Sequence, residues 1–268
     1  MNKTFFDLGL QEALVQAAGK LNFSEPTQIQ QEAVPVILAG ENIVGQSPTG
    51  TGKTMAYLLP LLQKIVPADP FVQAVVLAPT HELAMQISRH LQQLLEVSHL
   101  SVRMLSLIGG ANIARQMEKL KKKPQVIVGS ASRILELQKK GKLKLQQTRL
   151  LVLDEFDRLL DDQNFEGVAK IQECLHKDCQ YLLFSATAPG RALDRAGFLD
   201  KPKTIKITDT AVVHPQIENY YFIVEFRDKI EMLRKLTKSL PVKKGLVFIN
   251  RGYDVEATLE KILHSGIK

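Results

Sequence analysis

The chain has no tryptophan, few aromatic residues and almost no cysteine. Only two of its 268 residues are cysteines, so no disulfide framework is expected, and the reducing cytoplasm is the predicted location. No apolar run reaches the length of a signal peptide or a membrane span, so we expect no membrane partner. Aromatic residues make up 6% of the chain, which argues against a surface built for extensive stacking of nucleic-acid bases.

Positive charge is in excess. The chain has 35 Lys and Arg against 28 Asp and Glu, a formal net charge of +7 and a pI near 9.3, which is compatible with a polyanionic partner. The two cysteines, Cys174 and Cys179, flank His176. Three ligands fall short of a closed zinc site, so two reduced thiols are the preferred interpretation.

Short apolar runs alternate with longer amphipathic segments along most of the chain. The runs typical of strands span residues 42–46, 73–79, 101–107, 125–129, 149–154, 180–185 and 204–208. Segments with helical periodicity, such as 81–96 and 111–123, separate them. This alternation predicts an α/β fold with a parallel sheet covered by helices on both faces.

The residues after 208 repeat this pattern on a smaller scale. We predict a first domain over residues 1–208, a linker over 209–215 and part of a second α/β domain over 216–268. Within that part we expect strands at 219–226 and 245–250, and helices at 229–240 and 254–266. About 50 residues are too few for an independent domain of this class, so we expect it to be mobile or to self-associate through an open sheet edge.

A glycine-rich loop follows the first expected strand. Its sequence, SPTGTGKT, opens a helix, which is the context of a phosphate-binding loop. The glycines let successive backbone amides turn toward an anion, and the lysine supplies positive charge for the β- and γ-phosphates. The last threonine offers a hydroxyl to Mg²⁺. The predicted loop residues are Ser47, which stands where the strict pattern has glycine, and Pro48, Thr49, Gly50, Thr51, Gly52, Lys53 and Thr54.

Carboxylates gather after the strand at 149–154. Asp154, Glu155 and Asp157 follow four apolar residues, and two interpretations are open. Acids stabilise a helix N-terminus, and the carboxyl ends of parallel strands carry ligand chemistry. The phosphate-binding loop favours the second interpretation. Asp154 then holds Mg²⁺ through water, and Glu155 orients or deprotonates the water that attacks the γ-phosphate.

Together these motifs resemble those of the DEAD-box RNA helicases, ATP-dependent proteins with two RecA-like domains. The resemblance covers essentially the whole chain and implies a RecA-like phosphate-loop domain that uses ATP and Mg²⁺ and binds RNA. The segment LNFSEPTQIQ at 21–30 resembles the family's adenine-reading segment, with Asn22 in place of glycine. This implies that Gln30 binds the adenine edge, that Thr27 supports the site, and that Phe5, 17 residues before Asn22, stacks on the base.

The resemblance also implies contacts with the RNA backbone. PTHELA at 79–84 resembles the family's PTRELA, with histidine in place of arginine, and a glycine doublet follows at 109–110. GSASRI at 129–134 keeps the hydroxyl and the charge of the family's TPGR but lacks the Pro-Gly turn. The implied RNA-binding residues are Pro79, Thr80, His81, Gly109, Gly110, Ser130 and Arg133.

The sequence DEFD differs from the family's DEAD at Phe156, which we interpret as a packing substitution, the alternative being a direct ligand contact. The resemblance implies that Asp157 contacts Ser185 or Thr187 of a Ser-Ala-Thr motif that links nucleotide state to domain closure. VFIN at 247–250 resembles the first motif of the second domain. The family's arginine-rich HRxGRxGR motif is absent, so we expect the chain alone to be a weak ATPase.

Two lysine-rich segments, 119–124 and 138–144, are expected around the RNA-contacting strand ends, the alternative being solvated helix ends. The leading functional hypothesis is an RNA-dependent ATPase that separates short duplexes by domain closure. A DNA-directed translocase and an ATP-switched RNA clamp without unwinding are the alternatives. A GTPase lacks support because no Asn-Lys-x-Asp guanine-binding motif occurs.

Overall fold

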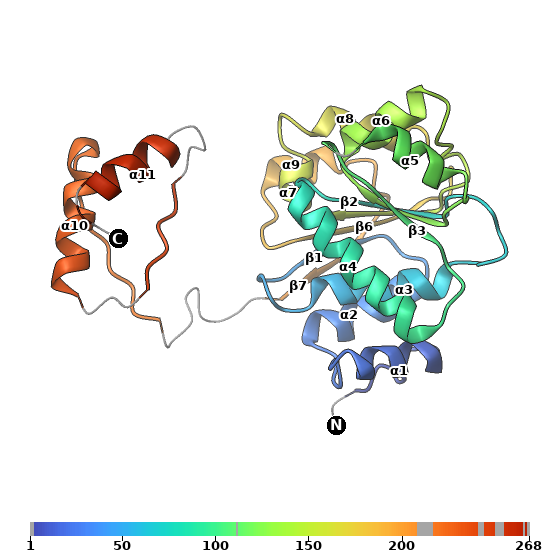
Figure 1. Cartoon of the computed structure of the whole chain (residues 1–268). Helices are drawn as coiled ribbons and strands as arrows, with labels where there is room; N and C mark the ends of the chain where they lie inside the picture. The colour runs from blue at the N-terminus through green and yellow to red at the C-terminus, as the bar shows by residue number, and fades with distance from the viewer. Residues whose placement is uncertain are drawn as a thin grey trace. The chain divides into compact units, whose positions relative to one another are not determined.

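Seven strands form one parallel sheet (Figure 1). The computed structural model describes residues 3–110, 112–207, 217–240, 244–249, 255–264 and 266. The strand order is β3-β4-β2-β5-β6-β1-β7, and the central strands are apolar and buried, as expected for a sheet covered on both faces. The strands are β1 (Ile43–Gln46), β2 (Ala74–Leu77), β3 (Met104–Leu107), β4 (Val126–Gly129), β5 (Leu150–Asp154), β6 (Gln180–Ser185) and β7 (Lys203–Lys206).

Helices cover the two faces of this sheet in two layers (Figure 1). One layer contains α2 (Gln28–Leu38), α3 (Lys53–Lys64) and α4 (His81–Ser98), with α1 (Glu12–Lys20) packed against α4. The other layer contains α5 (Ile113–Leu120), α6 (Ala131–Lys139), α7 (Phe156–Leu159), α8 (Phe165–Gln172) and α9 (Gly190–Arg195). The predicted parallel α/β architecture is therefore confirmed.

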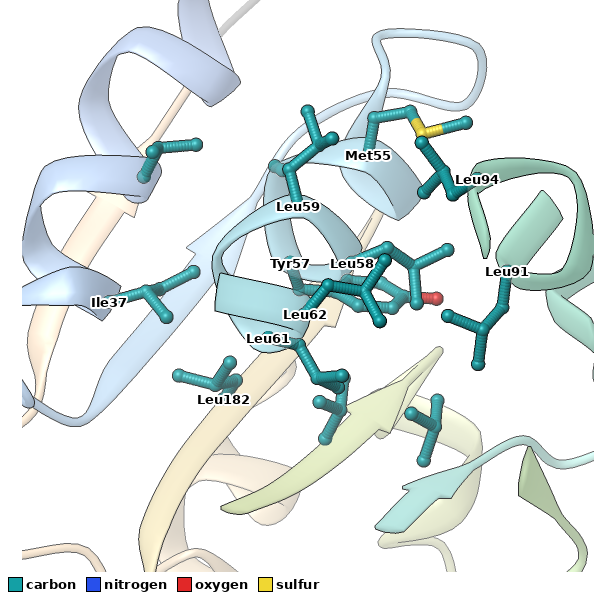
Figure 2. Packing of buried hydrophobic residues seen from close by; sticks show 14 of the residues in the cluster. Ile37, Met55, Tyr57, Leu58, Leu59, Leu61, Leu62, Leu91, Leu94 and Leu182 are labelled. Carbon is teal, nitrogen blue, oxygen red and sulfur yellow. The ribbon is translucent and has the colours of Figure 1, made fainter. Parts of the chain in front are cut away.

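The helix α3 is buried along most of its length. Its residues from Met55 to Leu62 are all buried, so it is apolar around its whole circumference, as expected of a helix enclosed by protein. Figure 2 shows these side chains packed against Leu91 and Leu94 of α4, Ile37 of α2 and Leu182 of β6. Each buried leucine contributes about 1.5–3 kcal/mol to folding. This packing fixes the position of the N-terminus of α3 at the end of β1.

The parallel arrangement of the strands separates the predicted motifs into two groups. The loops at 47–54, 79–84 and 109–110 and the acids at 154–157 follow strands, so they lie at the carboxyl edge of the sheet. The lysine-rich segments precede β4 and β5, so they lie at the opposite, amino edge. The expectation that these lysines surround the RNA-contacting strand ends is wrong, because the helices α5 and α6 carry the chain back across the sheet before each lysine-rich segment.

The chain divides into two compact units, Met1–Thr210 and Ala211–Lys268. The second unit contains η1 (Phe226–Asp228), α10 (Lys229–Ser239) and α11 (Val255–His264), so both predicted helices are present. Residues 219–225 and 245–249 are described and contain no strand, which corrects the prediction for these segments. A strand requires a hydrogen-bonded neighbour, and the apolar side chains here, such as Ile223 and Phe248, are exposed. The predicted linker at 209–215 lies outside the described residues.

Within the part of the chain that the structure describes, no helix combines the length and the apolar character needed to cross a membrane.

Candidate active site

The loop between β1 and α3 curves around the N-terminus of α3. Gly50 and Gly52 have φ angles of 84° and 91°, which residues with a side chain rarely adopt. The backbone amide of Ser47 donates to the carbonyl oxygen of Ser185 at 3.0 Å, which ties the loop to the end of β6. The hydroxyl groups of Ser47 and Thr51 lie 2.5 Å apart. The loop is therefore held in a concave shape that suits an anion at a helix N-terminus.

The side chain of Lys53 folds back over this loop. Its ammonium group donates to the carbonyl oxygens of Ser47 and Pro48 at 2.6 Å and 2.7 Å. Burial lowers the pKa of Lys53, and the negative charges of Asp154, Glu155 and Asp157 oppose that change. The three acids predicted from the sequence thus act electrostatically on the predicted phosphate-binding lysine.

Asp154 ends β5 as a nearly buried carboxylate, 4% exposed. The hydroxyl of Tyr57 on α3 donates to its Oδ2 atom at 2.8 Å, and Tyr57 is itself fully buried. Burial raises the pKa of Asp154, whereas the bond from Tyr57 and the charge of Lys53 oppose the rise. Sequence reasoning missed Tyr57, although its place one helical turn after Thr54 was a signal that it faces the same region.

Replacing Tyr57 with phenylalanine tests this bond. The variant leaves Asp154 with one donor fewer, so the pKa of this carboxyl should rise further. A carboxyl group whose pKa is higher in the folded state than in the unfolded state lowers the free energy of unfolding as the pH rises above the unfolded-state pKa, here about 3.8. We expect Tyr57→Phe to lower the free energy of unfolding by about 1–3 kcal/mol at pH 7, and by less as the pH falls toward 3.8.

Urea unfolding followed at pH 7 and near pH 4 measures this difference. Tyr181→Phe is the matched control, because the Tyr181 hydroxyl bonds to Gln172 rather than to a carboxylate. Equal losses of stability at both pH values in Tyr57→Phe would contradict the assigned role of the bond.

The two acids after Asp154 are positioned by the start of α7. Glu155 has a φ angle of 54°, a conformation that residues other than glycine rarely adopt, and its carboxylate lies 3.7 Å from Arg158. Asp157 accepts a hydrogen bond from the hydroxyl of Thr187, so the predicted contact with the Ser-Ala-Thr motif is present. The side chain of Phe156, the first residue of α7, is fully buried in the core, which confirms its interpretation as a packing residue.

Gln30 connects the predicted adenine-binding segment to the phosphate-binding loop. It is 1% exposed, its Oε1 atom accepts from the backbone amide of Thr27 at 2.9 Å, and its Nε2 atom donates to the carbonyl oxygen of Gly52 at 3.0 Å. A Cβ atom at Gly52 would lie only 2.4 Å from Nε2 of Gln30. Asn22, which replaces a glycine of the resembled family, has a φ angle of 64°, and asparagine tolerates this region better than most residues.

The aromatic residues near this segment differ in exposure. Phe5, the predicted base-stacking residue, is 2% exposed and belongs to the core, whereas its neighbour Phe6 is 66% exposed. Phe23 packs against the core and also lines the pocket beside the loop.

These elements line a pocket of about 480 Å³. The predicted residues that it brings together are Thr49, Gly50, Gly52, Lys53, Thr54, Asp154, Glu155, Asp157 and Ser185. The lining residues that sequence reasoning did not assign to a site are Phe23, Met55, Leu83, Gln86, His90, Arg158 and Ala186. Gln86 and His90 lie one turn apart on α4. The predicted helix at 81–96 was therefore enough to place them on one face.

The oxygen donors in this pocket fit Mg²⁺. Thr54 and Asp154 both line it, and a hydroxyl and a carboxylate are the ligands that this cation takes alongside water and phosphate. No group of three histidine, cysteine or acidic side chains suited to a metal ion occurs among the described residues, which include Cys174, His176 and Cys179.

The predicted RNA-binding residues lie around the carboxyl ends of β2, β3 and β4. A Cβ atom at Gly109 would lie 2.9 Å from Nε2 of His81, so the 79–84 loop and the glycine doublet meet. Thr80 caps α4 by accepting from the backbone amide of Leu83 at 3.2 Å. Ser130 precedes α6, and Arg133 on that helix is 11% exposed and lies 3.5 Å from Glu136.

A family model described as DEAD/DEAH box helicase matches residues 27–196, more than half of the chain. The chain belongs to this family. Among curated DEAD-box proteins it is 42% identical over 260 residues to the ATP-dependent RNA helicase CshC of Bacillus cereus, covering 97% of the chain and 66% of that protein. It is 38% identical to the probable ATP-dependent RNA helicase YfmL of Bacillus subtilis, covering 92% of the chain and 65% of that protein. The chain thus spans slightly less than two thirds of these DEAD-box relatives.

Solved DEAD-box structures share the fold. Dbp5 of S. cerevisiae bound to RNA and ADP BeF3 matches with a TM-score of 0.85 and 27% identity over 99% of the chain and 68% of that structure. A DEAD box protein from Methanococcus jannaschii matches with a TM-score of 0.72 and 30% identity over 99% of the chain and 72% of that structure. The RecA-like fold predicted from the sequence is confirmed.

Proposed function

We propose that the chain binds ATP with Mg²⁺ and contacts RNA as part of an ATP-dependent RNA helicase that remodels duplexes by ATP-driven domain closure. The observation that carries the proposal is that one pocket is lined both by the phosphate-binding loop and by Asp154, Glu155 and Asp157. The names of the relatives CshC and YfmL, both ATP-dependent RNA helicases, support it.

Each group in the pocket has a proposed task. Lys53 exchanges its loop carbonyls for the β- and γ-phosphates, and Thr54 and Asp154 hold the cation. Bound Mg²⁺ neutralises charge on the phosphate oxygens. Glu155 orients or deprotonates the attacking water from its position at the start of α7. The bond between Thr187 and Asp157 couples the end of β5 to the end of β6, which suits a link between nucleotide state and domain closure.

RNA is proposed to lie along the carboxyl edge of the sheet. The exposed ring of His81 beside Gly109, the turn at Gly110 and the hydroxyl groups of Thr80 and Ser130 offer contacts to the phosphate backbone. Arg133 would join them by exchanging Glu136 for a phosphate. Backbone contacts of this kind carry little sequence information, and the affinity should fall steeply with salt.

Steady-state ATP turnover with RNA, with DNA and with neither tests the proposal. We expect RNA to stimulate turnover and DNA to do so much less. Equal stimulation by DNA would favour a translocase, and RNA binding without turnover would favour a clamp. The absence of both ATP binding and RNA binding would contradict the proposal.

Several expectations remain predictions. They are the domain boundaries at residues 208 and 216, adenine binding by Gln30 and Thr27, base stacking by Phe5, weak ATPase activity of the chain alone, self-association of the second unit and a cytoplasmic location.

A further inference from the structure

A second cavity, of about 500 Å³, opens at the amino edge of the sheet. It is lined by residues 70–72 before β2, by Leu120, Lys123 and Pro124 before β4, and by residues 141–144, 146 and 147 before β5. Because β2, β4 and β5 are parallel neighbours, these three connections meet at one edge. This cavity lies at the end of the strands opposite to the candidate active site and the predicted RNA-contacting loops.

The charge at this cavity is positive. Lys123, Lys142 and Lys144 line it, all three are exposed, and among the described residues none has a carboxylate within 4.0 Å. Two nearby acids are already paired, Glu118 with Lys121 at 2.7 Å and Glu136 with Lys140 at 3.2 Å, whereas Asp69, next to Pro70 of the cavity wall, has no ion pair among the described residues. The exposed residues Arg103, Lys119, Lys122 and Lys139 extend the positive charge beyond the cavity.

Buried polar side chains hold the walls of this cavity in place. Gln125 is fully buried, donates to the carbonyl oxygens of Pro67 and Asp69 at 2.9 Å and 3.2 Å, and accepts from the backbone amide of Arg103 at 2.9 Å. Thr148, also fully buried, donates to the carbonyl oxygen of Val72 at 3.1 Å. The three connections are thus joined to one another, and the cavity is preformed rather than a chance meeting of surface loops.

We propose that this amino-edge cavity binds phosphates of single-stranded RNA that flanks the segment held at the carboxyl edge. The inference rests on the proposed function, and it assigns the lysine-rich segments a second contact with the same RNA. Strands of four or five residues separate the two edges by roughly 13–17 Å, so the two edges would hold different stretches of one RNA.

The distribution of charge favours a polyanion over an acidic peptide. The cations are not confined to the cavity lining, which matches a repeating charge better than one or two carboxylates. Most of them are lysines, whose point charges suit phosphates without requiring a fixed geometry. RNA already held at the carboxyl edge would also present its flank at a high effective concentration, so weak contacts here would add to the affinity.

Salt-dependent RNA binding tests the inference. The triple variant Lys123→Gln, Lys142→Gln, Lys144→Gln is compared with the unaltered chain by fluorescence anisotropy, using single-stranded RNAs of about 8 and about 30 nucleotides. For the long RNA, we expect the slope of log affinity against log salt to fall in magnitude by about 2, since each phosphate contact with a single strand contributes about 0.7. Binding of the short RNA should be unchanged.

The control is a charge-matched triple variant at the β7 side of the sheet, Lys201→Gln, Lys203→Gln, Lys206→Gln, whose lysines are all exposed. It should leave the slope for the long RNA unchanged. Urea unfolding of both variants verifies that they fold.

Three results would overturn the inference. An unchanged slope for the long RNA in the Lys123, Lys142 and Lys144 variant, with short-RNA binding intact, overturns this inference and leaves the proposed function standing. Polyglutamate is titrated in the same way, and its loss of binding in this triple variant without any change for RNA would reassign the cavity to an acidic protein. Failure of the unaltered chain to bind either RNA would overturn the RNA-binding part of the proposed function as well.

Discussion

Glu155→Gln should leave ATP bound and slow its hydrolysis by roughly 10²–10⁴-fold, the range for loss of a general base. Glu155 lines the pocket beside Asp154, at the start of α7. An amide of the same size keeps the shape of the site but cannot accept a proton. Single-turnover hydrolysis and equilibrium ATP binding separate the chemical step from binding.

Glu166→Gln is the matched control for this variant. Glu166 lies on α8, is 81% exposed and pairs with Lys170, so the same loss of charge occurs far from the pocket. Its hydrolysis rate should equal that of the unaltered protein. Normal turnover by Glu155→Gln would remove Glu155 from the mechanism, and loss of ATP binding by this variant would indicate a role in holding the nucleotide instead.

Gly52→Ala should lower the affinity for ADP at least tenfold. The φ angle of 91° disfavours alanine by about 1–2 kcal/mol, and the new Cβ atom would lie 2.4 Å from Nε2 of Gln30. Relief of that overlap displaces either the loop or the Gln30 amide, and both belong to the proposed nucleotide site. Titration calorimetry with ADP and Mg²⁺ measures the loss.

Gly19→Ala serves as the control, because Gly19 lies in α1 and a Cβ atom there meets nothing within 4 Å. Alanine in a helix stabilises it by about 0.5–1 kcal/mol relative to glycine, so Gly19→Ala should raise the free energy of unfolding and leave the affinity for ADP unchanged. ADP affinity in Gly52→Ala within twofold of the unaltered chain would mean that the close contact with Gln30 is not needed for binding.

The phosphate-binding loop and the acids at 154–157 could be predicted because the residues of each motif are consecutive in the sequence. The loop needs its glycines at nearby positions, and the end of a strand is recognised where an apolar run stops. Tyr57 is different. Its hydroxyl meets Asp154 only because α3 packs against β5, and a tyrosine within a run of apolar helix residues is equally typical of the core.

Two errors have a common physical origin. The lysine-rich segments were placed at the wrong edge of the sheet because charge alone carries no direction, whereas their order relative to β4 and β5 does. Residues 219–225 have the apolar composition of a strand, yet strand structure is a property of a pair, and none is formed within the described part of the second unit. In both cases the outcome depends on a segment elsewhere in the fold, and the local sequence pattern does not identify that segment.

The hydrogen bond from Gln30 to Gly52 has a consequence for redesigning nucleotide preference. One amide group faces the segment that is proposed to read the base, and the same group supports the loop that is proposed to hold the phosphates. In a library that varies position 30 alone, a residue chosen for a new base would leave the carbonyl oxygen of Gly52 without its donor. Variants with the desired base preference would therefore lose support for the phosphate-binding loop. Engineering should therefore vary residues 27, 30 and 52 together, as one unit of sequence.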